Sequence, residues 1–148
     1  MKFLVILATL TLSSALQAKM ICPNISATYK CTNDIGGVST MTISQSKASG
    51  GFDTLDVDGD MFIIGGNKQP VTLSELTGFP FVATSECSDT GFLSTFWPEI
   101  DPAAEPLEKY QFEIKITQTG ITYGFAIKKQ GSEEFVPDSE PLNCVVTK

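Results

Sequence analysis

The stretch KYQFEIKITQTGITYGFAIKK, Lys109 to Lys129, decides the fold class, because apolar and polar residues alternate along both of its halves. A two-residue turn at Thr119 and Gly120 would fold it into a hairpin. The cross-strand pairs predicted on the apolar face are Ile116 with Tyr123, Ile114 with Phe125 and Phe112 with Ile127, and those on the polar face are Gln111 with Lys128 and Glu113 with Ala126. One buried and one solvated face are typical of an antiparallel sheet.

Outward from this hairpin, shorter alternating segments separated by Gly, Asn, Asp and Pro predict further strands. They are residues 25–31, 38–45, a hairpin within 55–64, 71–73, 81–87 and 142–147. No helical periodicity is long enough to predict a helix. About eight strands joined by short loops indicate an all-β fold, a small antiparallel up-and-down barrel, with a β-sandwich as the alternative.

The N-terminal residues 1–18, MKFLVILATLTLSSALQA, are typical of a secretory signal peptide. Lys2 precedes an apolar run from Phe3 to Leu12, and a small residue, Ala18, ends the segment. The run is shorter than the roughly 20 apolar residues of a membrane span. We therefore expect a secreted or periplasmic product whose residues 19–148 form a single all-β domain, without a membrane span.

Charge and composition restrict the function further. Without Lys2, nine Lys oppose 17 Asp and Glu, a formal charge of 9 − 17 = −8, so binding to nucleic acid phosphates is not expected. The chain contains neither His nor Arg. A Ser-His or Cys-His nucleophile, the usual zinc site and an arginine clamp for phosphate are thereby excluded. We expect no cofactor and no enzyme activity.

The four cysteines, Cys22, Cys31, Cys87 and Cys144, follow the predicted signal peptide, and in an oxidising compartment they would form two disulfides. Residues 25–31 are predicted to be extended, so Cys22 and Cys31 lie too far apart to be joined. Two arrangements remain. Either Cys22 pairs with Cys87 and Cys31 with Cys144, or Cys22 pairs with Cys144 and Cys31 with Cys87.

Residues 88–108, SDTGFLSTFWPEIDPAAEPLE, interrupt the strand pattern with three prolines and four carboxylates after Trp97. Since Pro is restricted to strand edges and the segment exceeds a hairpin turn, it is predicted to be a long excursion over the barrel. Its apolar members are Phe92, Phe96, Trp97 and Ile100. They either close the core at one end, or line an apolar ligand pocket with Tyr29 and Tyr123 as polar handles, or form a docking patch for a protein.

The segment DVDGD offers Asp56, Asp58 and Asp60 as oxygen ligands for a weak cation site. Its spacing departs from the EF-hand loop, which requires Gly and Glu where this chain has Met61 and Asn67. As a hairpin, Asp58 and Gly59 form a type I′ turn that aligns the apolar side chains on one face and separates Asp56 from Asp60. A three-residue loop with a bulge at Gly59 would instead place Asp56 across from Asp60, where the two carboxylates could share a cation, but it would scatter the apolar face. The plain turn is the preferred interpretation.

The segment CPNISATYKC, Cys22 to Cys31, with the strand and hairpins that follow it, resembles the start of lipocalin-like (calycin) barrels. That family carries Gly-x-Trp or a similar pair on the first strand. The matching triplet here is Ala27-Thr28-Tyr29, with Ala in place of Gly and Tyr in place of Trp. The resemblance implies transport or sequestration of a small apolar molecule inside the barrel.

Together these observations predict a non-catalytic protein that binds a small apolar molecule in or at the mouth of a β-barrel. The second prediction is a protein-interaction or inhibitor module that uses the 88–108 loop, stiffened by the disulfides. A carboxylate-based hydrolase comes third, since two acids can act without His.

Overall fold

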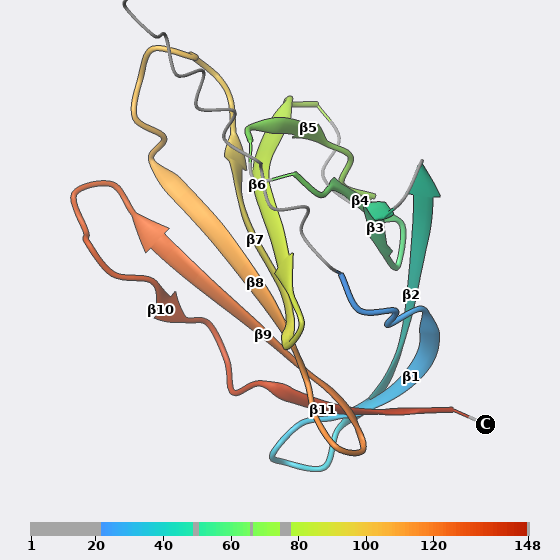
Figure 1. Cartoon of the computed structure of the whole chain (residues 1–148). Helices are drawn as coiled ribbons and strands as arrows, with labels where there is room; N and C mark the ends of the chain where they lie inside the picture. The colour runs from blue at the N-terminus through green and yellow to red at the C-terminus, as the bar shows by residue number, and fades with distance from the viewer. Residues whose placement is uncertain (1–21, 49–50, 66, 75–77, 148) are drawn as a thin grey trace, which may run out of the picture.

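The computed structural model describes residues 22–48, 51–65, 67–74 and 78–147, which form one antiparallel sheet (Figure 1). Its strands are β1 Ala27–Thr32, β2 Val38–Ala48, β3 Gly51–Val57, β4 Asp60–Ile63, β5 Gln69–Val71, β6 Phe81–Ser88, β7 Gly91–Pro98, β8 Glu108–Ile116, β9 Gly120–Lys129, β10 Val136–Pro137 and β11 Leu142–Val146. None of the described segments is a helix that could cross a membrane. The predicted signal peptide, residues 1–18, lies outside the described residues.

The sheet nearly closes into an up-and-down barrel. Its strand order is β4-β3-β2-β1-β11-β9-β8-β7-β6-β5, so β11 returns to pair with β1, as Figure 1 shows. At the other junction, Met61 of β4 and Thr72, just after β5, exchange backbone hydrogen bonds of 2.8 and 3.2 Å. Only β10 stands off this path, paired with β9. The all-β, antiparallel barrel predicted from the sequence is confirmed.

The described residues form eleven strands instead of about eight, and the main correction concerns residues 88–108. They are not one long loop, because Gly91–Pro98 forms β7 between β6 and β8. Proline cannot donate a backbone hydrogen bond to the sheet, but the first proline of this segment is Pro98. The aromatic and β-branched residues before it favour a strand. The excursion is thus confined to residues 99–107. The short β10 was also not predicted.

The turn of the β8–β9 hairpin lies one residue earlier than predicted. Ile114 pairs with Tyr123 and Phe112 with Phe125, so every partner is displaced by two residues, while the same side chains stay on the inner face. Gly120 is a strand residue, not a turn residue. A Cβ there would lie 2.0 Å from the carbonyl oxygen of Cys144 on β11, so glycine serves the close approach of the two strands.

The β3–β4 hairpin has the predicted register. Asp58 and Gly59 have φ angles of 53° and 95°, as a type I′ turn requires. Leu55 faces Phe62 across the ladder, and Val57 faces Asp60. These four side chains share the inner face because residues alternate along each strand.

The two disulfides adopt one of the two arrangements left open by the sequence. Cys31 and Cys144 are opposite each other on β1 and β11, so their bond joins the strands that close the sheet. The bond between Cys22 and Cys87 holds the closing segment, residues 22–26, at the end of the barrel where β6 ends. There the hydroxyl of Tyr29 donates to the carbonyl of Ile25 at 2.8 Å.

The centre of the barrel is filled by the ring of Phe62, which is 2% exposed. Its centroid lies 4.6 Å from that of Phe112, 5.9 Å from that of Phe96 and 6.4 Å from that of Phe92, each in an edge-to-face arrangement. Such pairs add about 0.5–1.5 kcal/mol to the stabilisation from area burial alone. This aromatic core joins β4 to β7 and β8 across the interior.

We predict that Phe62→Ala lowers the free energy of unfolding by about 3–5 kcal/mol, because it removes the ring on which three others pack. Urea denaturation at equilibrium measures the change. Ile35→Ala is the control, since Ile35 is 86% exposed in the β1–β2 loop and its truncation should change stability by less than about 0.5 kcal/mol. A loss below about 1 kcal/mol for Phe62→Ala would contradict the central role of this ring.

The disulfide arrangement can be checked by digestion after lysine under non-reducing conditions. Cleavage places each cysteine in a separate peptide, with Cys22 in 20–30, Cys31 in 31–47, Cys87 in 69–109 and Cys144 in 130–148. Mass spectrometry should find 20–30 joined to 69–109 and 31–47 joined to 130–148. Peptides joined in the other arrangement would show that the barrel closes differently.

Candidate functional site

A cavity of about 520 Å³ opens at the barrel end away from the closing segment. The tip of the β3–β4 hairpin, the end of β7, the start of β8 and the end of β9 meet there. We call this cavity the mouth, and the residues that line it are Asp58, Asp60, Leu73, Ser74, Phe96, Tyr110 and Phe125. The Cys22–Cys87 bond lies at the other end, where Cys87 pairs with Phe92 near the beginning of β7.

One wall of the mouth is aromatic. The rings of Phe96 and Tyr110 have centroids 5.4 Å apart, and Tyr110 stacks on Phe125 with a centroid distance of 6.1 Å. The Tyr110 hydroxyl donates to a carboxylate oxygen of Glu108 at 2.7 Å. This hydrogen bond, together with burial and the negative charge of Glu108, raises the pKa of Tyr110 above its usual value. The only polar atom of these three rings is therefore already hydrogen-bonded within the chain, and the rest of the wall is apolar.

The opposite wall carries two carboxylates in fixed positions. Asp60 shares the inner face of the hairpin with Phe62, and its Oδ1 accepts hydrogen bonds from the Ser74 amide at 2.6 Å and the Ser74 hydroxyl at 2.8 Å. Asp58, in the turn, accepts from the Thr42 amide at 2.7 Å. These bonds hold both carboxylates without neutralising them, because every donor is uncharged.

Tyr123, on β9, is a partly buried tyrosine whose pKa is raised. Its ring packs against Phe112 with a centroid distance of 5.8 Å. Burial raises the pKa of Tyr123, and the negative charges of Asp60 and Asp58 raise it further.

The structure divides the residues predicted to bind a ligand. Phe92 and Phe96 point into the barrel, where Phe92 is 4% exposed and belongs to the core, whereas Phe96 also lines the mouth. Trp97, next along β7, is half-buried on the outer face. Ile100 follows β7 and is 74% exposed. Tyr29 lies at the closed end, with its hydroxyl bonded to the closing segment.

Trp97 and Ile100 lie instead at an outer groove of about 560 Å³ between the 99–107 excursion and the strands below it. The ammonium group of Lys109 stands 5.4 Å from the centroid of the Trp97 ring, close enough for a cation–π contact. Lys68 forms an ion pair with Glu99 at the same groove. The groove is thus partly occupied by the chain's own charged side chains.

The three carboxylates of DVDGD do not meet. Asp56 is opposite Met61, so it lies on the face away from Asp60, and its Oδ1 accepts from the Gly59 amide at 3.0 Å. Across the part of the chain that the structure describes, no three acidic, His or Cys side chains are grouped as a metal site would need. The hairpin register thus separates Asp56 from the two carboxylates of the mouth.

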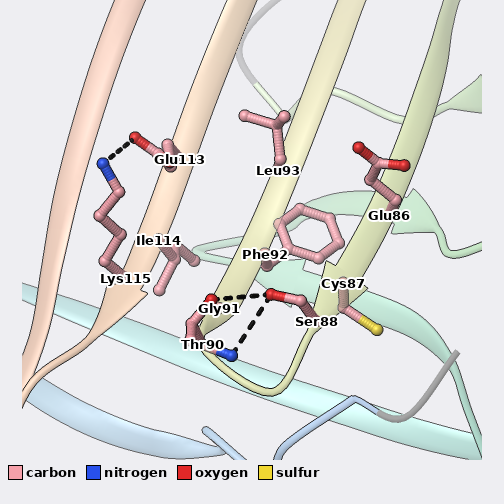
Figure 2. Close-up of a pocket in the computed structure, with 10 residues that line it drawn as sticks. All are labelled: Glu86, Cys87, Ser88, Thr90, Gly91, Phe92, Leu93, Glu113, Ile114 and Lys115. Carbon is pink, nitrogen blue, oxygen red and sulfur yellow. Dashed lines mark hydrogen bonds and ion pairs between the residues drawn. The ribbon is translucent and has the colours of Figure 1, made fainter.

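A third hollow, of about 540 Å³, lies beside the β6–β7 turn (Figure 2). Its polar groups bond mainly to one another. Lys115 forms an ion pair of 2.8 Å with Glu113, and the hydroxyls of Ser88 and Thr90 are 2.9 Å apart. Its lining also exposes less apolar surface than the lining of the mouth.

The sequence did not identify Tyr110 as a residue that lines the mouth. It also did not show that the carboxylate of Asp60 lines the same cavity. Tyr110 continues the alternation of Phe112 and Ile114, which was a sufficient signal for its side of the sheet. The register of DVDGD likewise placed Asp60 on the side of Phe62. That the two hairpins face each other across one cavity has no local signal.

No protein-family model, curated protein or solved structure matches this chain. The resemblance to lipocalin-like barrels therefore stays a prediction.

We predict that Asp60→Asn lowers the pKa of Tyr123, because it removes a negative charge that disfavours the phenolate. Titration by phenolate absorbance measures the shift, and Tyr123→Phe identifies which of the three tyrosines is responsible. Asp56→Asn is the matched control and should leave Tyr123 unchanged, since Asp56 lies on the other face of the hairpin. An unchanged or higher pKa in Asp60→Asn would show that Asp60 does not face the mouth.

Proposed function

We propose that this protein binds a small, largely apolar molecule at the mouth of its barrel, without catalysing a reaction on it. The observation that carries the proposal is the cavity of about 520 Å³ with its wall of Phe96, Tyr110 and Phe125. Small-molecule sites are typically concave and mostly apolar, with a few polar groups in defined positions and volumes of about 300–1,000 Å³.

The mouth is favoured over the barrel centre as the binding position. Phe62 and the three rings packed on it occupy the centre. The closing segment covers the other end, where the Gln45 side chain accepts from the Ile25 amide at 2.7 Å and donates to the Pro23 carbonyl at 3.1 Å. A ligand would therefore contact Phe96, where the packed core ends and the mouth begins.

A binding role is favoured over catalysis by the pKa values of two tyrosines, Tyr110 in the wall of the mouth and Tyr123 on β9. A general acid or base works best when its pKa lies near the working pH. The pKa values of Tyr110 and Tyr123 are both raised, which moves them further from neutral pH. The chain also contains no His, the side chain most often used for proton transfer.

We further propose that the protein acts outside the cytoplasm, as a secreted or periplasmic protein. The two disulfides are consistent with an oxidising compartment. The predicted signal peptide at residues 1–18 is the sequence feature that supports export.

The second candidate function is binding of another protein through residues 99–107. Its supporting observation is the exposure of Ile100 and Leu107, at 74% and 70%, on a segment that borders the outer groove. Because large exposed apolar side chains become buried in interfaces, residues 99–107 are the surface through which another protein would be bound.

Binding at the mouth can be tested with N-phenylnaphthylamine, an uncharged dye whose emission increases in apolar surroundings. We expect saturable binding at one site per chain and about tenfold weaker binding by Phe125→Ala, which removes part of the aromatic wall. Phe135→Ala is the matched control, because Phe135 contacts Lys128 and does not line the mouth. Urea denaturation checks that both variants are folded.

Two results would contradict the proposal. One is the absence of saturable binding by the folded wild-type protein. The other is equal weakening by Phe125→Ala and Phe135→Ala, which would place the dye elsewhere. If the dye were no longer bound after deletion of residues 99–107 but were still bound by Phe125→Ala, its site would be the outer groove. That result would favour the protein-interaction alternative.

A further inference from the structure

We infer that the mouth selects organic cations, namely protonated amines attached to an apolar or aromatic body. This inference rests on the proposed function and specifies its ligand class. It starts from the composition of the two walls, with carboxylates of Asp58 and Asp60 on one side and the rings of Phe96, Tyr110 and Phe125 on the other.

The charge at the mouth is of one sign. Two carboxylates line it, and none of the described residues that line it is a lysine. Burial is the main cause of the raised pKa of Tyr123, and the charges of Asp60 and Asp58 add to it. With a formal net charge of −7 for the whole chain, an approaching cation is attracted and an approaching anion is repelled.

The hydrogen bonds of Asp60 leave one oxygen for a ligand. Both donors of Ser74 bond to Oδ1, so Oδ2 is the atom that can accept from an ammonium group. Ser74 also fixes the orientation of the carboxylate, which reduces the entropy lost on binding. Asp58 is positioned in a similar way by the Thr42 amide on its Oδ1.

The aromatic wall suits a cation as well as an apolar body. Ring faces attract cations within about 6 Å of their centroids, and the effect grows when water is displaced. Tyr110 and Phe125 stack with an interplanar angle of 22°, so together they present a broad surface to an apolar group. A neutral ligand of the same shape would desolvate Asp60 without compensating its charge.

A bare metal ion is a poorer fit than an amine. Calcium takes six to eight oxygen ligands, and the described residues hold no group of three metal-ligating side chains. The mouth instead combines two carboxylates and the Ser74 hydroxyl with three aromatic rings, and the rings would not serve such an ion.

The test compares three ligands that share one ring system and differ in the head group: naphthylethylamine, naphthylethanol and naphthylacetate. Isothermal titration calorimetry of the disulfide-bonded protein near neutral pH measures each affinity. We expect the amine to bind about tenfold more tightly than the alcohol, from one charge pair and one cation–π contact, and the acetate most weakly. Added salt should reduce the preference for the amine.

Substitutions of the aspartates show whether the preference for the amine arises at the mouth. Asp60→Asn retains an oxygen that accepts from Ser74 but removes the charge, so it should weaken the amine several-fold and leave the alcohol unchanged. Asp56→Asn changes the net charge equally on the outer face of the same hairpin and should alter neither ligand. Asp58→Asn gives a second test at the mouth if Asp60→Asn fails to fold.

The outcomes separate this inference from the proposed function. If the alcohol binds as tightly as the amine, or if Asp56→Asn weakens the amine as much as Asp60→Asn does, the preference for cations is wrong while binding at the mouth stands. If neither the three ligands nor the uncharged dye bind the folded protein, the proposed function fails and this inference fails with it.

Discussion

The packing of Phe62 against Phe92, Phe96 and Phe112 is the interaction on which the rest of the structure depends. The ring comes from a four-residue strand, β4, yet it reaches the inner face of the sheet formed by β7 and β8. It therefore holds together two parts of the barrel that are distant along the chain. Because it fills the centre of the barrel, the space lined by Phe96, Tyr110 and Phe125 lies at the mouth and not in the interior.

The register that buries Phe62 also creates the site. Side chains alternate along a strand, so the residue two positions before Phe62, Asp60, must lie on the same inner face but nearer the end of the barrel. The type I′ turn at Asp58 and Gly59 leaves no other arrangement of this hairpin. Core formation and the orientation of a carboxylate into the mouth are thus two consequences of one pairing.

The two ends of the barrel differ, since one is covered by the closing segment and the other opens into the mouth. At the closed end, the Cys22–Cys87 bond and Gln45 hold the closing segment against the barrel. At the mouth, the carboxylates are held by hydrogen bonds of Ser74 and Thr42 that are independent of any ligand. A site whose charged groups are already oriented loses little conformational entropy when a ligand binds, which is how a small domain can gain affinity.

Alternation, turn residues and cysteine spacing in the sequence alone were sufficient for the all-β class, the β3–β4 register and a choice between two disulfide arrangements. These features depend on neighbours a few residues apart. The turn before Gly120 and the convergence of Asp60 with Tyr110 were decided only by tertiary structure. Gly120 shows the reason: its place is set by the carbonyl of Cys144 on β11, and such contacts between distant strands leave no local pattern.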